Sequence, residues 1–177
     1  MKTLETLKRY ASLGTVSHGT LRTEDLLEAF TAEIDWQIRR DSAFWAKPEN
    51  KEAVVSLRRT QDEATTCWKD GELNPEQEDL AQELVNETLP DLLTQHFAAP
   101  YCYFGTHPGD GSDFGFWPED MESIKEQVGF ASSVNHEYPD DNFRGEWLHI
   151  NERGNCTLYV REATLNGPKD REIWSVV

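Results

Sequence analysis

The sequence has few basic residues and no long hydrophobic run. Only 17 of its 177 residues are Lys or Arg, against 33 Asp or Glu, so the formal net charge is −16. No apolar stretch approaches the roughly 20 residues of a membrane-spanning helix, and the first residues lack the apolar segment of a secretory signal. Six Trp and a hydrophobic content of 37% are typical of a folded chain. We therefore expect a soluble, acidic, cytoplasmic protein.

The charge also limits the partners. A net charge of −16 lies far outside the magnitude of roughly 2–8 that is enough for solubility in a small domain. It disfavours direct binding to nucleic acid, because phosphate contacts need a basic surface, and it disfavours anionic membranes for the same reason. It favours a basic partner, such as a nucleic-acid-binding protein. The alternative is that the acidity only maintains solubility.

Cysteine and histidine are scarce and scattered, which disfavours several kinds of site. The chain has three cysteines, which are Cys67, Cys102 and Cys156. Because their number is odd and their spacing is wide, we expect free thiols and no disulfide framework. Zinc bound by Cys67, His96, Cys102 and His107 is disfavoured, because no Cys-x-x-Cys pair exists. Cys102, between two tyrosines, is predicted to be a buried thiol rather than a nucleophile. Phosphate-binding and dinucleotide-binding motifs are absent.

Residues 1–98 have helical periodicity. The clearest helix begins at Thr23, a predicted N-cap, with acidic residues in its first turn and basic residues at its end, as the helix dipole favours. Its apolar residues share one face: Leu26, Leu27, Phe30, Ile34 and Ile38. Other helices are expected over residues 3–12, from Pro48 to Gly71 and from Asn74 onward. The segment GTVSHGT is expected to be a loop, and Pro90 to kink or end the last helix near Thr88 or Leu89.

Residues 100–177 are rich in aromatic residues, glycine and turn signals. Two short strands are expected on either side of the loop HPGDGSD, followed by a short helix over residues 119–128. A hairpin of strands 146–150 and 156–160 and a last strand over residues 171–177 complete the pattern. The sequence therefore predicts an α+β fold in a single domain, 1–177. The helical half, 1–98, would pack on an antiparallel meander formed by 100–177.

The most specific feature is a row of acidic residues in the helix that begins at Asn74. Ten acidic residues and one Lys lie between Gln61 and Leu92. Four of these acidic residues are spaced three or four positions apart and therefore share one helix face. No basic residue lies four positions after any of them. The four residues are Glu76, Asp79, Glu83 and Glu87. An ordinary solvated helix mixes the two signs, so the row predicts a surface for a basic partner. The alternative is a solvated face.

A second acidic tract spans residues 110–141. A single row has a charge about every 6 Å along the helix axis, whereas duplex DNA has one about every 1.7 Å. A mimic of DNA would therefore need a second acidic surface beside the first. The second tract supplies nine acidic residues against one Lys: Asp110, Asp113, Glu119, Asp120, Glu122, Glu126, Glu137, Asp140 and Asp141.

The loop from His107 to Asp113 is the best candidate for a small site. Its imidazole, the two carboxylates of Asp110 and Asp113 and its two glycines could hold Ca²⁺ or Mg²⁺. It lacks the ligand run of an EF-hand, and the alternative is a tight glycine turn between aromatic strands. Trp117 follows the loop and is predicted to anchor a partner at the edge of the acidic surface, since Trp is favoured in binding hot spots. The alternative for Trp117 is a place in the core.

Three segments carry a resemblance: YFGTHPGDGSDFGFWPE, GEWLHINERGNCTLYVRE and REIWSVV. Together with the segment ASLGTVSHGTLRTEDLL, they resemble a group of small, uncharacterised acidic proteins of proteobacterial phages and integrated mobile elements. The group implies no established activity. Such elements often encode small acidic inhibitors of host defence, some of which mimic DNA to block restriction or CRISPR nucleases, so the analogy implies an anti-defence role.

We therefore predict a non-catalytic inhibitor that occupies a basic nucleic-acid-binding surface of a host defence complex, of the anti-CRISPR or antirestriction type. The expected partner-binding residues are Glu76, Asp79, Glu83, Glu87, Asp110, Asp113 and Trp117. One alternative is a metal-binding or hydrolytic domain that uses the loop from His107 to Asp113. Another is a structural protein that forms homodimers through an exposed sheet edge. We assign no catalytic residue, metal or cofactor.

Overall fold

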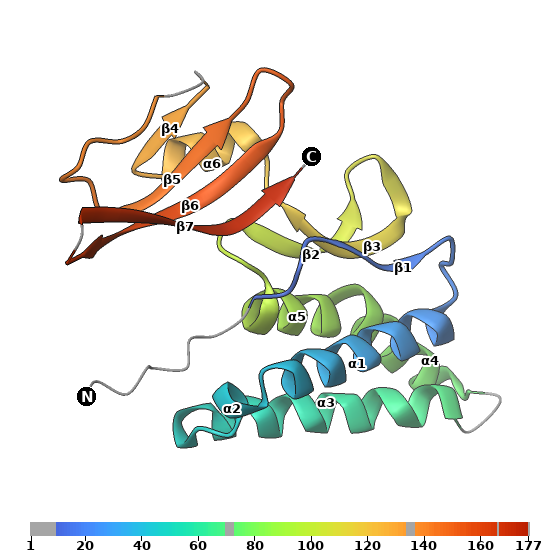
Figure 1. The fold of residues 1–177 in the computed structure, drawn as a ribbon. Coiled ribbons are helices and arrows are strands. Elements are labelled where there is room, and N and C mark those ends of the chain that lie inside the picture. Colours follow the sequence, from blue (N-terminus) through green and yellow to red (C-terminus); the bar gives the residue numbers. More distant parts are fainter. Residues whose placement is uncertain (1–9, 70–72, 134–136, 166, 177) are drawn as a thin grey trace. The chain divides into compact units, whose positions relative to one another are not determined.

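The computed structural model describes residues 10–69, 73–133, 137–165 and 167–176. The chain forms two compact units. Unit 1 comprises Met1–Ala98 and Tyr103–Trp117, and unit 2 comprises Ala99–Cys102 and Pro118–Val177. Helices dominate the first half and strands the second (Figure 1), so the predicted α+β class is confirmed. The single domain stays a prediction, and the helix expected over residues 3–12 lies largely outside the described residues.

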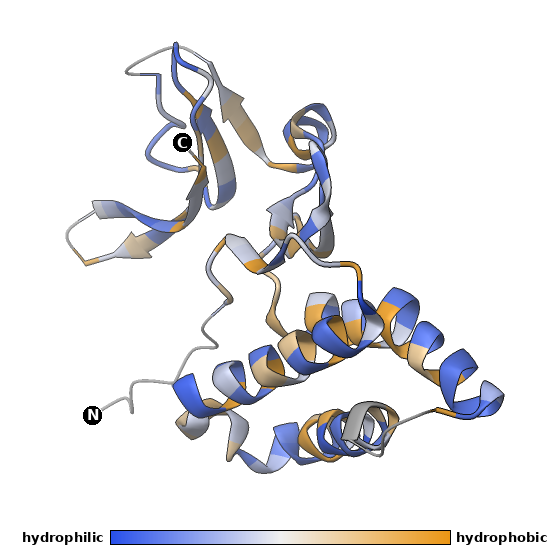
Figure 2. Ribbon diagram, turned by 90° about the vertical axis from the view of Figure 1, so that its right-hand side faces the viewer, coloured by the Kyte–Doolittle hydropathy of each residue, from blue (hydrophilic) through white to orange (hydrophobic). Residues whose placement is uncertain are grey.

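Two long helices form the base of unit 1. Helix α1 (Thr23–Arg40) buries the apolar face that its spacing predicts. The short helix α2 (Ser42–Trp45) and the 3₁₀ turn η1 (Pro48–Asn50) lead into α3 (Lys51–Lys69), so the proline opens this helical segment as expected. Hydrophilic and hydrophobic residues alternate along these helices (Figure 2), because only one face of each is covered.

The start of α1 differs from the prediction by one residue. The N-cap is Arg22, which makes no capping hydrogen bond with its side chain, and Thr23 is the first helical residue. The Thr23 hydroxyl instead accepts a hydrogen bond of 2.9 Å from Gln82 Nε2 in a later helix. The Thr23 side chain, which the sequence pattern predicts to cap α1, therefore makes a tertiary contact with Gln82 instead.

The expected loop GTVSHGT contains a strand, so that expectation was wrong. Strand β1 (Gly14–His18) pairs antiparallel with β3 (Asp110–Pro118), which also neighbours β2 (Cys102–His107) in a sheet of order β1-β3-β2. This segment has only one apolar residue among glycine and polar residues, so its intrinsic strand propensity is low. Its extended conformation is stabilised by pairing with β3. The pairing requires Gly115, because a Cβ there would lie 2.1 Å from the carbonyl oxygen of Gly14.

An aromatic cluster joins α1 to this three-stranded sheet. Phe30 is fully buried, with its ring centroid 4.9 Å from that of Phe104 and 5.4 Å from that of Phe114. Phe104 in turn contacts Phe116 edge to face, at 5.0 Å. Edge-to-face pairs of this kind add to the free energy of burial. The cluster is therefore the centre of the core of unit 1.

Three consecutive helical segments complete unit 1. They are α4 (Pro75–Glu83), a π-helical turn η2 (Leu84–Thr88) and α5 (Leu89–Phe97). The winding changes from π to α between Thr88 and Leu89, where Pro90 was predicted to act, and the chain stays helical to Phe97. A proline cannot donate the hydrogen bond that an uninterrupted α-helix requires, so the change of winding beside it is expected.

Unit 2 contains a second sheet, of order β4-β5-β6-β7. Its strands are β4 (Phe130–Ser132), β5 (Gly145–Ile150), β6 (Cys156–Thr164) and β7 (Gly167–Val176). The predicted hairpin of β5 and β6 is antiparallel, as is the β6–β7 pair. The sheet also contains a strand that the sequence analysis did not predict, β4, which pairs parallel with β5. Strand β4 has only three residues and lies at the start of a polar stretch, so no alternating hydrophobic pattern predicts it.

The polypeptide enters unit 2 twice. Its first segment, Ala99–Cys102, is tied to the later one by backbone and side-chain hydrogen bonds. Trp174 Nε1 donates to the Pro100 carbonyl at 2.9 Å, and the Tyr101 hydroxyl donates to Glu146 Oε2 at 2.8 Å. Burial, together with the hydrogen bond to Glu146, raises the pKa of Tyr101 to about 12. The short α6 (Met121–Gln127) follows the re-entry and is capped by Asp120.

A polar network is enclosed in unit 2 beside Trp147. Arg161 is buried and makes two hydrogen bonds with Asp170, from Nε at 2.8 Å and from the terminal nitrogen at 2.7 Å. The same guanidinium donates to the carbonyl of Pro139, and Trp147 Nε1 donates to Asp170 at 3.1 Å. The hydrogen bond from Arg161 holds the pKa of Asp170 below its ordinary value. The network fastens the segment before β5 to strands β6 and β7.

Candidate partner-binding surface

A capping box fixes the start of the acidic helix. The Asn74 side chain accepts a hydrogen bond of 3.0 Å from the backbone N–H of Gln77, and the Gln77 side chain accepts one of 3.1 Å from the backbone N–H of Asn74. Pro75 is the first helical residue. The predicted N-cap and first residue of this helix are therefore confirmed, and the acidic row starts from a defined residue.

The opposite face of this helical segment is buried. Its apolar side chains are almost completely covered: Ala81, Leu84, Val85, Leu89 and Leu93. This burial fixes which way the helix faces, so the remaining positions point to solvent.

The predicted acidic row lies on the exposed face. Its four members are all exposed: Glu76, Asp79, Glu83 and Glu87. None of them has an ion pair with another residue in the described parts of the chain. Residues 74–97 contain no Lys or Arg at all. The negative charge of the row is therefore not neutralised by its own helix.

The cations of unit 1 pair elsewhere. Arg58 on α3 and Arg39 on α1 both bind the carboxylate of Asp35. Burial alone would raise the pKa of Asp35, but the hydrogen bonds from these two guanidinium groups outweigh it and the pKa is lowered. Arg59 pairs with Glu63 on the same helix at 3.5 Å. Helices α1 and α3 thus carry charges of both signs, some of them in ion pairs, whereas α4 carries negative charge alone.

Asp110 makes its hydrogen bonds within the predicted loop site, whereas Asp113 contacts strand β1 and keeps one buried oxygen, Oδ1, without a hydrogen-bond partner. Asp110 accepts hydrogen bonds from the Ser112 N–H at 2.9 Å and the Ser112 hydroxyl at 2.8 Å, which lower its pKa. Asp113 accepts one of 3.2 Å from Thr15, and only 16% of its side chain is exposed. His107 Nδ1 accepts from the Gly109 N–H at 3.0 Å. These contacts are those of a structured turn, and they match the turn alternative.

No group of three or more His, Cys, Asp or Glu side chains suited to one metal ion occurs among the residues that the structure describes. The loop from His107 to Asp113 therefore does not assemble the ligands that the metal-binding alternative needs, since Ca²⁺ takes six to eight oxygens. In the proposed zinc set, His96 packs against Trp45 with ring centroids 6.1 Å apart.

Trp117 is partly buried on β3. Its Nε1 donates to the Gly105 carbonyl at 3.1 Å, and its ring meets that of His107 edge to face at 4.7 Å. The indole N–H is therefore used inside unit 1, while part of the ring stays accessible. Its role as a partner anchor stays a prediction.

The second acidic tract is divided between the units. Asp110 and Asp113 belong to unit 1 with the helical row, and the tract's members from Glu119 onward belong to unit 2. Within unit 1 the expected site residues lie on three elements, the row on α4 and η2 and the others on β3. The row is thus the only part of the predicted set that one continuous helical segment holds together.

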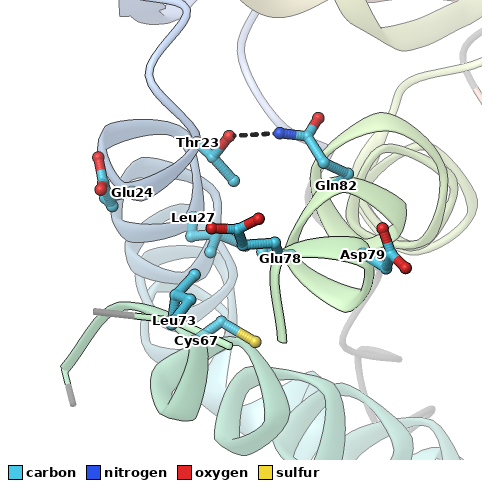
Figure 3. Close-up of a pocket in the computed structure, with 9 residues that line it drawn as sticks. Thr23, Glu24, Leu27, Cys67, Leu73, Glu78, Asp79 and Gln82 are labelled. Carbon is cyan, nitrogen blue, oxygen red and sulfur yellow. Dashed lines mark hydrogen bonds between the residues drawn. The ribbon is translucent and has the colours of Figure 1, made fainter. Parts of the chain in front are cut away.

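A pocket of about 760 Å³ lies next to the acidic row, between α1, α3 and α4. Its apolar lining includes Leu27, Cys67 and Ala81, and its acidic lining includes Glu24, Glu78 and Asp79. Figure 3 shows Glu78 reaching from α4 toward α1, over Leu27. The sequence analysis did not single out Glu78, because it lies outside the three-and-four spacing of the row. The only available signal was its place in the first turn of α4.

The three cysteines are free, as predicted, and all three are buried. The prediction that Cys102 is a buried thiol is therefore confirmed. Burial, together with the charge of Glu119, raises the pKa of Cys102 to about 12.

No protein-family model, no curated protein and no solved structure matches the chain. Among the described residues, no helix has both the length and the hydrophobicity that crossing a membrane requires.

The cap of α4 has a measurable effect. We expect Asn74→Ala to lower the free energy of unfolding by about 1 kcal/mol, because the backbone N–H of Gln77 loses its acceptor. Urea denaturation followed by far-ultraviolet circular dichroism measures the change. Asn74→Asp, which retains a side-chain acceptor, is the control and is expected to stay close to the wild type. An equal loss in both variants would contradict the capping role.

Proposed function

We propose that this protein is a non-catalytic binding protein whose acidic face, on α4 and η2, attaches to a basic surface of a partner protein. One observation carries the proposal: four exposed carboxylates share one capped and well-packed helical segment that contains no cation. They are Glu76, Asp79, Glu83 and Glu87. In the setting that the sequence resemblance suggests, the partner is a host defence complex and the surface is one that holds nucleic acid.

The spacing of the row argues for attachment to a basic surface rather than a copy of a duplex. Charges about 6 Å apart along one helix are sparser than the phosphates of DNA, at about 1.7 Å. A sparse row still attracts a basic surface over about 8 Å at physiological ionic strength. Complementary charge of this kind mainly raises the rate of association. We therefore expect fast association that weakens steeply with salt.

The proposal predicts that reversing three charges of the row abolishes binding. In the variant Asp79→Lys, Glu83→Lys, Glu87→Lys, like charges would face the basic surface, at a cost of several kcal/mol. The tagged protein is used to capture partners from a proteobacterial lysate at low and at high salt, and captured proteins are identified by mass spectrometry. The expected result is a nucleic-acid-binding protein that is lost at high salt, displaced by added DNA and not captured by the variant.

A matched control separates the row from net charge. The variant Glu49→Lys, Glu52→Lys, Asp62→Lys changes the charge by the same amount on exposed residues of η1 and α3. It is expected to capture the same partner with little loss. Equal capture by the row variant and the wild type would overturn the proposal. Light scattering of the purified protein checks the homodimer alternative at the same time.

A further inference from the structure

We infer that the pocket beside α4 receives an arginine side chain of the basic partner. The inference rests on the proposed function, because it names the group by which that partner would be held. The pocket has a volume of about 760 Å³ and is lined by residues of α1, α3 and α4 and by Leu73. This volume is enough for one long side chain together with part of the chain that carries it.

One apolar residue of the pocket wall stays accessible. It is Leu73, which is half-buried. Behind it, Leu27, Cys67 and Ala81 come from three different helices and are buried, so they close the pocket. A long cationic side chain packs its methylene groups on an apolar residue such as Leu73 while its charged end stays at the rim. This apolar contact favours Arg or Lys over a small inorganic cation.

The rim offers hydrogen-bond acceptors, and none of the described residues that line the pocket is Lys or Arg. Glu78 has no ion pair with any residue in the described parts of the chain, and its side chain reaches over Leu27 (Figure 3). Glu24, by contrast, already pairs with Arg22 at 3.3 Å. Asp79 points away from Glu78, on the other side of α4 (Figure 3). Glu78 is thus the carboxylate placed to pair with a side chain in the pocket.

The neighbouring polar contacts favour a guanidinium group. Across the pocket, Gln82 Nε2 donates to Thr23 Oγ1 at 2.9 Å, which links α4 to α1. The Gln82 side-chain oxygen accepts from Asn86 at 3.2 Å, and an amide oxygen has room for a second donor. A guanidinium has five donors in a fixed plane and can bind a carboxylate through two of them. An ammonium is a compact charge that gains less from acceptors spread along a rim.

The experiment uses two labelled peptides, hexa-arginine and hexa-lysine, with the full chain in fluorescence anisotropy at low salt. We expect hexa-arginine to bind the wild type more tightly than hexa-lysine. Glu78→Gln should weaken hexa-arginine by about fivefold, since a charge-assisted hydrogen bond at the exposed rim is lost, and should remove the preference for arginine. The control Glu83→Gln changes the same charge on the same helix but does not line the pocket. It should weaken both peptides only slightly.

The outcomes separate the pocket from the row. If Glu78→Gln and Glu83→Gln weaken hexa-arginine equally, or if the wild type binds both peptides equally, the arginine pocket is wrong while the acidic row still attracts cations. If neither peptide binds the wild type at low salt, the proposed function itself is contradicted. Circular dichroism of each variant checks that the helices are retained, and Glu78 is exposed, so its replacement by glutamine leaves the core intact.

Discussion

Replacing Phe30 with alanine is expected to lower the free energy of unfolding by about 4 kcal/mol, because the removal of a buried phenyl ring leaves a cavity. The ring is fully buried and contacts Phe104 and Phe114 of the sheet in unit 1. It is therefore the main apolar contact between α1 and that sheet. Urea denaturation followed by far-ultraviolet circular dichroism measures the loss.

Trp36→Ala is the matched control for this prediction. Trp36 lies on the same helix, but 58% of its surface is exposed, so its truncation is expected to cost less than about 0.5 kcal/mol. A cost below about 1 kcal/mol for Phe30→Ala would contradict the central place of the aromatic cluster. A large cost for Trp36→Ala would indicate that this exposed ring is covered in solution.

Replacing Arg161 with methionine is expected to destabilise unit 2 by about 3 kcal/mol, because it leaves a carboxylate and a carbonyl without their donor. Asp170 would keep only the indole N–H of Trp147, and the carbonyl of Pro139 would lose the guanidinium. Urea denaturation followed by tryptophan fluorescence and by far-ultraviolet circular dichroism measures the loss. The double variant Arg161→Met, Asp170→Leu removes the uncompensated charge and is expected to recover part of the loss.

The same network has a signature in pH. The pKa of Asp170 is lowered in the folded protein, chiefly by its hydrogen bond with Arg161. A carboxyl group with a lowered pKa stabilises the fold above its ordinary pKa of 3.8 and loses that contribution as the pH falls through the folded value. The difference in stability between the wild type and Arg161→Met should therefore be full at neutral pH and shrink in acid below about pH 4. A difference that does not change with pH would rule out the ion pair as its cause.

Helices α1 and α4 could be predicted because each has a clear local signal. The spacing from Leu26 to Ile38 marks the buried face of α1, and Asn74 with Pro75 marks the start of α4. The acidic row follows directly from this, since a known start and a known buried face fix which positions are exposed. Glu76 and its partners are therefore exposed where the spacing places them.

The missed elements depend on contacts between distant parts of the chain. Strand β1 exists through its pairing with β3, about a hundred residues later, and β4 through its parallel pairing with β5. The burial of Asp113 likewise depends on Thr15 across that pairing. The pocket beside α4 requires side chains from three helices at once, so no local pattern indicates that Glu78 and Leu27 line it.

Unit 2 is formed by two separate segments of the chain, and this limits which truncated forms of the protein can fold. A cut after Ala98 would remove the strands that cover Phe30, and it would leave Pro100 and Tyr101 with unit 2. A cut after Trp117 would keep unit 1 whole but take from Trp174 its hydrogen-bond acceptor. No single cut yields both units intact. Deletion mapping of a partner would thus lose binding for reasons of folding, and point substitutions are the sound way to locate the contact.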